Sequence, residues 1–267
     1  RGSVLKVDHL AVEVCHGGVM VDDVCFDLQG GEILGIAGVQ GNGQTELVQA
    51  LTGLKPTASG KINLLGNNVT KKNPRRITEL GSAHIPEDRQ KDGLVLARTV
   101  AENLVLNTYY RPPFARGVIL QHKNILANAS DLIKKFDIRT PNSSTLVHYL
   151  SGGNQQKVII AREFSRPIKL LIASQPTRGL DVGSIEYIHN RIVEKRDQGC
   201  AVLLVSTELD EIMQLSDRIA VMFRGKILTT VNAREVSKEE LGLLMAGVMP
   251  TLKKKKVEGT QVQELIT

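Results

Sequence analysis

The chain has 267 residues, 42% of them hydrophobic and 23% charged, which is typical of an ordinary globular protein with one large α/β domain or two small ones. A net charge of +6 is only modestly basic, and three widely spaced cysteines argue for a reducing compartment and against a disulfide framework. No apolar run approaches the ~18 residues of a membrane-spanning helix. Aromatic residues at 3%, with no Trp, disfavour a base-stacking surface for nucleic acid.

The first part of the chain alternates short apolar runs with glycine turns. Alternating or apolar runs predict strands over Leu5–Val7, Ala11–Val14, Val24–Leu28 and Ile33–Ala37. A helix pattern follows Gly43, with its apolar residues on one face.

From about residue 86 to residue 164 the pattern becomes helical and polar, and then the α/β alternation resumes. The strongest helical pieces are Val100–Leu106, Ile125–Phe136 and Asn154–Phe164. The later predicted elements are strands Leu170–Ala173 and Ala201–Val205, helices Ile185–Lys195, Leu209–Leu215 and Lys238–Ala246, and a hairpin of Ile219–Phe223 with Lys226–Thr230.

Strands that alternate with helices predict a parallel sheet covered on both faces. We expect an α/β fold with an N-terminal antiparallel β subdomain and an inserted α-helical subdomain. The expected domain spans residues 1–249: residues 1–87 form the β subdomain with the first part of the core, 88–164 the helical subdomain, and 165–249 the rest of the core. Residues 250–267, with four Lys against two Glu, are expected to form a basic flexible tail.

A glycine-rich segment between the fourth strand and the first helix fits the phosphate-loop pattern G-x-x-x-x-G-K-[ST], except that Gln44 replaces the lysine. Such a loop turns backbone N–H groups toward an anion at the positive end of a helix. Thr45 is placed to contact Mg²⁺. The candidate nucleotide-binding residues here are Gly38, Val39, Gln40, Gly41, Asn42, Gly43, Gln44, Thr45 and Glu46. A dinucleotide-binding loop is excluded because Glu46 stands where it needs glycine or alanine; a glycine turn without ligand is the other alternative.

The missing lysine has an energetic consequence. A unit charge pair ~4 Å apart at an effective dielectric constant of ~20 is worth roughly 4 kcal/mol before desolvation. Even half of that exceeds a tenfold change in affinity or rate. Gln44 offers hydrogen bonds and no charge, so we expect weakened nucleotide binding and slow hydrolysis.

A second motif runs from Leu150 to Lys157 and reads L-S-G-G-N-Q-Q-K. Ser151 is a good helix N-cap, and Gly152 and Gly153 leave the N–H groups at the helix start accessible to an anion; the alternative is a capped helix of the core. The segment resembles the signature sequence of ATP-binding cassette (ABC) transporter ATPases. That resemblance implies a P-loop NTPase core, with ATP and Mg²⁺ as cofactors and a signature that meets the phosphate bound by a partner cassette.

The resemblance extends to L-L-I-A-S-Q-P-T-R-G-L-D at residues 170–181, with departures from the family pattern. Ser174 stands where the family has a Mg²⁺-orienting aspartate, and Gln175 where it has the catalytic glutamate. Thr207 occupies the position of the switch histidine. Asp181 keeps the acid of the D-loop. A neutral glutamine cannot accept the proton of the attacking water, so the resemblance implies a degenerate site.

Two further positions complete the resemblance. Glu87 aligns with the glutamine that senses the γ-phosphate and Mg²⁺, and it is a second candidate metal contact. His16 aligns loosely with the residue that stacks on adenine; an exposed turn residue is the other interpretation.

Together these motifs resemble the second, C-terminal cassette of a fused ATP-binding subunit that serves importers of sugars and nucleosides. The resemblance implies a peripheral protein on the cytoplasmic face of the membrane. Its partners would be a first-half cassette and transmembrane permease subunits, with no direct contact to nucleic acid or to the solute. This half would supply its signature to the partner's ATP site and have weak or no ATPase activity alone. The alternative is a non-transport cassette with a regulatory, nucleic-acid-associated or ribosome-associated role.

Overall fold

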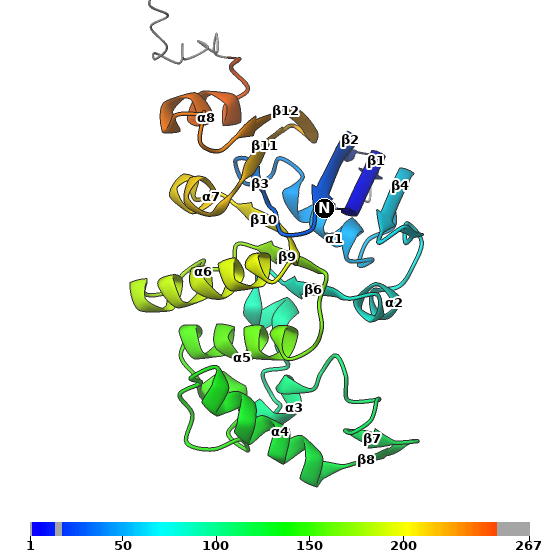
Figure 1. Ribbon diagram of the computed structural model, residues 1–267, viewed down its shortest axis with the longest axis vertical. Helices are drawn as coiled ribbons and strands as arrows, with labels where there is room; N and C mark the ends of the chain where they lie inside the picture. The colour runs from blue at the N-terminus through cyan, green and yellow to red at the C-terminus, as the bar shows by residue number, and fades with distance from the viewer. Residues whose placement is uncertain (1, 14–17, 250–267) are drawn as a thin grey trace, which may run out of the picture.

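In the computed structural model, residues 2–13 and 18–249 are described. Two sheets dominate the fold. The first is antiparallel, with strand order β2-β1-β4-β5. It contains β1 (Ser3–Glu13), β2 (Val19–Gln29), β4 (Ser59–Leu64) and β5 (Asn67–Asn68), and lies to one side of the molecule (Figure 1). The structure therefore merges the two predicted strands Leu5–Val7 and Ala11–Val14 into one strand, β1, up to Glu13; Val14 lies outside the described residues.

The second sheet has six strands in the order β12-β11-β3-β10-β9-β6. Five strands run parallel, and only the edge strand β12 is antiparallel. The strands are β3 (Ile33–Ala37), β6 (Ser82–Ile85), β9 (Leu170–Ser174), β10 (Ala201–Ser206), β11 (Arg218–Phe223) and β12 (Lys226–Asn232). The predicted parallel sheet and its terminal hairpin are confirmed.

Side chains of the central strands alternate between two hydrophobic cores, because successive residues of a strand point to opposite faces. On β3, Ile33 and Ala37 join one core while Leu34 and Ile36 join the other. One core contains the first sheet and α1 (Gln44–Leu51). The other contains residues of α5 (Gly152–Phe164), α6 (Val182–Asp197), α7 (Leu209–Leu215) and α8 (Lys238–Met245). The predicted cover on both faces is thus confirmed.

The helical segment between β6 and β9 lies at the opposite end of the molecule from α8 (Figure 1). It holds α3 (Val100–Leu104), α4 (His122–Lys135), α5 and two short turns, Arg89–Gly93 and Val147–Tyr149. Sequence patterns did not predict α2 (Pro74–Glu79), β4, β5 or β6, nor the small hairpin of β7 (Ala115–Arg116) and β8 (Ile119–Leu120). Among the described residues, no helix has both the length and the apolarity to cross a bilayer.

A buried charge cluster fastens the helical segment to the sheet. Glu163, near the end of α5, accepts hydrogen bonds from Arg162 (3.0 Å), Arg166 (2.8 Å) and Asn107 (2.6 Å). Arg166 also donates to the backbone carbonyl of Ser82 on β6 at 2.6 Å. Burial alone would raise the pKa of Glu163, but the two guanidinium groups hold it below its usual value. The carboxylate therefore stays ionised where α5 meets the core.

Candidate functional site

The phosphate loop, residues 38–45, connects β3 to α1 at the carboxyl end of the sheet. Gly41 and Gly43 adopt φ values of 91° and 101°, a left-handed conformation that favours glycine. A β-carbon on Gly43 would collide with the backbone carbonyl oxygen of Met20 on β2. Glycine is required here because the loop lies directly against the neighbouring strand.

The side chain of Gln44 is folded back into this loop. It is 7% exposed, and its Nε2 atom donates to the carbonyl oxygen of Val39 at 3.1 Å. A β-carbon on Gly38 would collide with the same Nε2 atom, so the amide fills the space beside the loop backbone. Gln44 thus provides a hydrogen-bond donor for one backbone carbonyl group of the loop and brings no charge to it.

The β11–β12 turn braces the loop from the other side. Asn42 accepts the N–H of Arg224 on its side-chain oxygen at 3.0 Å, and its backbone carbonyl accepts the N–H of Gly225 at 2.9 Å. The carbonyl of Gly225 in turn accepts the N–H of Asp22 on β2 at 2.8 Å. Two other segments, the β11–β12 turn and β2, thus hold the phosphate loop in its left-handed conformation.

The structure brings the two predicted metal contacts together. The Thr45 hydroxyl donates to Glu87 Oε2 at 3.2 Å, and Glu87 Oε1 pairs with Arg178 Nη1 at 2.7 Å. A hydroxyl and a carboxylate oxygen are ligand types that Mg²⁺ accepts, with the rest of its shell from water and phosphate. Sequence reasoning missed Arg178 as a partner, since it lies 91 residues from Glu87 and no local pattern pairs them.

Gln175 and Thr207, predicted from separate segments, also meet. Gln175 Oε1 accepts the backbone N–H of Thr207 at 3.3 Å and its hydroxyl at 3.4 Å. Gln175 has a φ of 47°, and its own N–H donates to the carbonyl of Val205 at 2.7 Å. Ser174 is buried at the end of β9. These three side chains carry no ionisable group near neutral pH.

A cavity of about 540 Å³ opens at this edge of the sheet. Its lining includes the two predicted catalytic residues, Gln175 and Thr207, together with Gln40, Glu87 and Arg178. Two further lining residues, His189 and Glu211, were not predicted. They are joined at 2.8 Å, and no sequence motif marked either residue.

Glu211 is a buried carboxylate in that cavity. The Thr177 hydroxyl and His189 Nε2 both contact its Oε1 atom, at 2.7 and 2.8 Å. Burial raises its pKa, but hydrogen bonds from His189, Ser206 and Thr177 outweigh this effect and lower the pKa below the usual value. Glu211 is therefore a poor proton acceptor near neutral pH.

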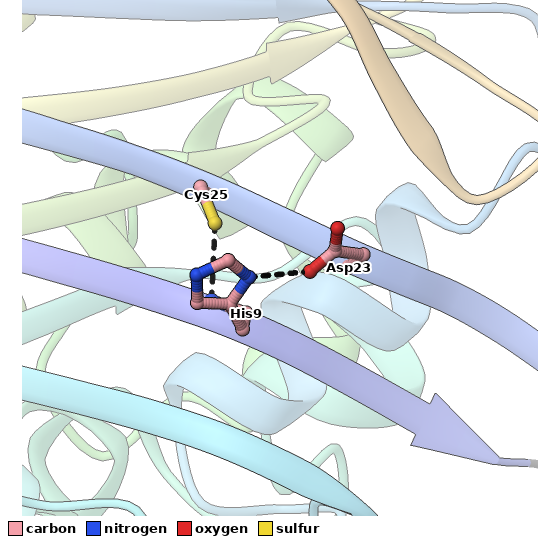
Figure 2. Close-up of side chains that lie close together, drawn as sticks. All are labelled: His9, Asp23 and Cys25. Atoms are coloured by element: carbon pink, nitrogen blue, oxygen red, sulfur yellow. Dashed lines mark hydrogen bonds and ion pairs between the residues drawn. The ribbon is translucent and has the colours of Figure 1, made fainter.

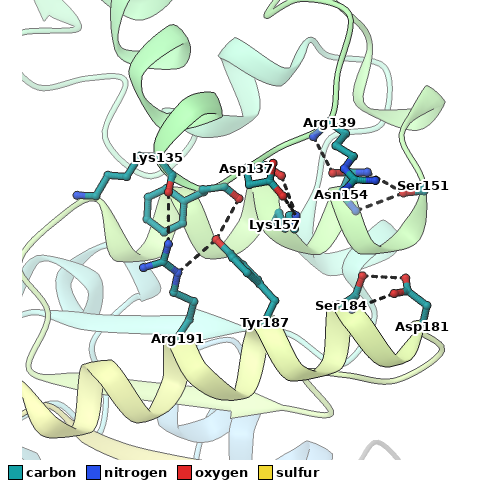
Figure 3. Close-up of polar contacts among 11 residues, drawn as sticks. Lys135, Asp137, Arg139, Ser151, Asn154, Lys157, Asp181, Ser184, Tyr187 and Arg191 are labelled. Carbon is teal, nitrogen blue, oxygen red and sulfur yellow. Dashed lines mark hydrogen bonds and ion pairs between the residues drawn. The ribbon is translucent and has the colours of Figure 1, made fainter.

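The signature segment opens α5, with Ser151 as its N-cap (Figure 3). The Ser151 hydroxyl accepts from the backbone N–H of Asn154 at 3.5 Å and from its side-chain amide at 2.9 Å. Asn154 Oδ1 in turn accepts the N–H of Arg139 at 2.7 Å. Ser151 is exposed, so a 13-residue helix presents its N-terminal dipole to solvent here.

Close packing joins the signature helix to α6. A β-carbon on Gly153 would collide with the Ser184 hydroxyl, which explains the glycine. Asp181 caps α6 by accepting the N–H of Ser184 at 2.9 Å and its hydroxyl at 2.8 Å (Figure 3). The two hydrogen bonds from Ser184 lower the pKa of Asp181.

Ser151, Gly153 and Asp181 line a second cavity of about 340 Å³, which also includes Lys157 and Asp137. None of its lining residues belongs to the 540 Å³ cavity. Gln40 of the phosphate loop and the signature residues Ser151 and Gly153 therefore line different spaces within one chain. The remaining candidate, His16, lies outside the described residues, as does the predicted tail at 250–267.

The family model described as "ABC transporter" matches residues 21–178. The chain is 52% identical over 244 residues to the guanosine import ATP-binding protein NupO of Bacillus subtilis, covering 91% of this chain and 48% of that protein. It is 50% identical to the nucleoside import ATP-binding protein NupA of Lactococcus lactis subsp. cremoris, with the same coverage of 91% and 48%. The chain spans about half the length of the curated relatives it matches.

Solved structures agree on the fold. MJ1267, an ATP-binding cassette of an ABC transporter, superposes with a TM-score of 0.72 at 21% identity, over 92% of this chain and 96% of that one. The cassette MJ0796, solved as a dimer bound to ADP and Pi, gives a TM-score of 0.72 at 20% identity, over 87% and 100%. These matches and the family model lead to one conclusion: the chain belongs to the ABC transporter family and is an ATP-binding cassette domain.

Proposed function

We propose that this chain is a degenerate cassette of a nucleoside importer that binds MgATP, hydrolyses it slowly or not at all alone, and completes the ATP site of a partner cassette. The observation that carries the proposal is an asymmetry within the chain. The side chains at its own phosphate loop and catalytic edge are neutral at Gln44, Ser174, Gln175 and Thr207. The signature at Ser151, by contrast, is a complete helix N-terminus open to solvent.

Several contacts support weak turnover in this chain's own site. Gln175 already uses its amide oxygen to accept from Thr207, and a neutral amide cannot take a proton from water. Glu211, the buried carboxylate nearby, is held ionised by its donors and has a lowered pKa. MgATP binding itself is supported by the glycine loop and by the Thr45–Glu87 pair.

The separation of the two cavities supports a partner cassette. Gln40 of the phosphate loop lines one cavity and Ser151 lines the other, which supports a counterpart from another cassette for each element. The half-length match supports a second cassette on the same polypeptide in the import relatives. In this arrangement the chain sits peripherally at the cytoplasmic face and meets permease subunits.

The names of the relatives support nucleosides as the transported class, with guanosine in one and nucleosides in the other. A glucose import ATP-binding protein is more distant at 37% identity. The cassette itself does not touch the solute in this proposal. These import relatives favour transport over a regulatory or nucleic-acid-associated role.

The test measures ATP turnover by this chain alone and after mixing it with a cassette that carries the phosphate-loop lysine and the catalytic glutamate. We expect little turnover alone and a clear gain on mixing. Ser151→Asp keeps an N-cap acceptor but places a negative charge against the incoming phosphate, so it is expected to lower the mixed turnover at least about tenfold.

Thr45→Ala is the matched control, because it alters this chain's own phosphate loop and leaves the signature intact. The mixed turnover is expected to fall much less with Thr45→Ala than with Ser151→Asp. Robust turnover by the chain alone, abolished by Thr45→Ala, would contradict the proposal. Unchanged thermal denaturation of both variants checks that the fold is intact.

A further inference from the structure

A second group of polar side chains lies on the exposed face of the first sheet, away from both cavities. The pairing of β1 with β2 shifts register at four places, and two of these lie on either side of the Leu10–Val24 pair. Between the pairs Val7–Phe26 and Leu10–Val24, β1 has one residue more than β2; between Leu10–Val24 and Val12–Val21, β2 has one more than β1. Two bulges on opposite strands thus face each other across one residue pair.

Each bulge contains a residue other than glycine with positive φ. His9 has a φ of 49° and Asp23 a φ of 56°, a conformation that costs of order 1 kcal/mol or more in such residues. The neighbouring strand accommodates the first bulge with Gly60, because a β-carbon there would collide with the backbone of His9 and Leu10. The sheet is therefore built around these two distorted positions.

The bulges bring together three side chains of different chemistry, each of which can act as a metal ligand (Figure 2). His9 Nδ1 lies 2.6 Å from Asp23 Oδ1, and the backbone N–H of His9 donates to Cys25 Sγ at 3.1 Å. Asp23 and Cys25 flank Val24 on one face of β2, as alternate residues do. One ligand atom from each of the three side chains lies within 4.8 Å of the others, and all three residues are exposed.

We propose that His9, Asp23 and Cys25 form a binding site for a Zn²⁺-class divalent cation, with water as the fourth ligand. Imidazole nitrogen, thiolate sulfur and carboxylate oxygen are all zinc ligands, with bonds of roughly 2.0–2.3 Å. A tetrahedral ion then needs ligand atoms about 3.3–3.7 Å apart, so exposed side chains reach it by shifts of about 1 Å. Thiolate and imidazole ligands select Zn²⁺ over Mg²⁺ or Ca²⁺.

This site is separate from nucleotide chemistry. None of the three residues lines the 540 Å³ or the 340 Å³ cavity. An ion there would tie β1 to β2 across the paired bulges and hold both distorted residues in place. The proposal does not depend on the proposed function, because the ligands belong to the first sheet alone.

The experiment uses the full chain, stripped with EDTA under a reductant without thiols, and then titrated with Co²⁺ and Zn²⁺. Saturable binding of one Co²⁺ per chain with a near-ultraviolet thiolate-to-cobalt absorption, displaced by Zn²⁺, is the expected result. Cys25→Ser is expected to abolish that absorption and lower Zn²⁺ affinity at least about tenfold. His9→Gly and Asp23→Asn, which both tolerate positive φ, are expected to lower the affinity to a similar extent.

Cys15→Ser is the matched control, since it removes a cysteine that is not a ligand in this proposal, and it is expected to keep both the absorption and the affinity. The proposal is overturned by an absence of saturable binding, by absorption that survives Cys25→Ser, by absorption lost in Cys15→Ser, or by full affinity in His9→Gly and Asp23→Asn. Because Cys25 is exposed, its substitution is expected to leave the fold intact. Circular dichroism melts of each variant in EDTA that match those of the unsubstituted chain exclude misfolding.

Discussion

At the scale of single residues, Gln44 is the clearest case of a side chain that changes what a loop can do. Its amide donates to the carbonyl oxygen of Val39 within the phosphate loop and adds no charge there. Glu87, which accepts from the Thr45 hydroxyl, is paired with Arg178 at 2.7 Å. The loop therefore offers an incoming phosphate backbone N–H groups and a helix dipole, but no free lysine.

The first prediction follows from that missing charge. Gln44→Lys is expected to lower the dissociation constant for ATP at least about tenfold, because even half of the roughly 4 kcal/mol Coulomb interaction exceeds 1.4 kcal/mol. Turnover by the chain alone is expected to stay low, since Gln175 and Thr207 remain neutral. Calorimetric titration with ATP and a steady-state ATPase assay measure the two effects.

Gln44→Met serves as the control, because it removes the hydrogen bond to Val39 without adding a charge. It is expected to leave ATP affinity the same or weaker. Equal gains from lysine and methionine would show that the amide's contact with the loop, rather than the absent charge, limits binding.

At the scale of elements, the signature helix α5 packs closely against α6. Gly153 has no room for a β-carbon beside the Ser184 hydroxyl, whereas Gly183 would meet only Asp181, at 3.5 Å. Both glycines occupy the first turn of a helix, so they share the same local cost of conformational freedom. The difference between them lies in the contact of α5 with α6.

The second prediction compares these two glycines. Gly153→Ala is expected to destabilise the chain by about 1–3 kcal/mol through overpacking. Gly183→Ala is expected to be neutral or to stabilise by up to about 1 kcal/mol, as alanine does in helices. Urea denaturation followed by circular dichroism gives both values. The packing argument fails if the two substitutions have the same effect.

At the scale of the whole molecule, the joint between the sheet and the helical segment contains a histidine as well as the Glu163 cluster. His84 lies on β6, and its buried Nε2 atom has no hydrogen-bond partner among the residues that the structure describes. Burial lowers its pKa from 6.5 to about 4, against a smaller opposing effect of Glu163. Folding therefore keeps this imidazole neutral.

The third prediction concerns pH. Because the folded pKa lies below the unfolded one, the unfolded chain binds a proton between pH 6.5 and about 4 that the folded chain does not. Stability is therefore lost as pH falls through this range, by about 1.6 kcal/mol from His84 between pH 6.5 and 5. His84→Leu is expected to flatten this part of the curve of unfolding free energy against pH.

His122→Gln is the matched control, because it removes one exposed histidine. Its curve of unfolding free energy against pH is expected to follow that of the unsubstituted chain. Urea unfolding at half-unit steps from pH 7 to pH 5 separates the two variants. A slope that persists in His84→Leu would assign the acid sensitivity to other groups.

Sequence patterns predict the main elements of the large sheet and the segments that carry the motifs. β3, β9, β10 and α7 lie within a residue of their predicted ranges, because apolar runs bounded by turns report burial directly. Short elements such as β6 and the β7–β8 hairpin are not predicted, because so few residues show no recognisable hydrophobic periodicity. β1 was divided in two because the bulge at His9 breaks the alternation on which strand prediction depends.

Which distant residues come into contact depends on the tertiary structure. Gln175 reaches Thr207 across 32 residues, Glu87 reaches Arg178 across 91, and His9 reaches Asp23 and Cys25 across paired bulges. Gln40 of the phosphate loop and Ser151 of the signature likewise line separate cavities. Motifs record the local backbone and side-chain chemistry of a segment, whereas these contacts depend on strand order and register, which only the packed sheets specify.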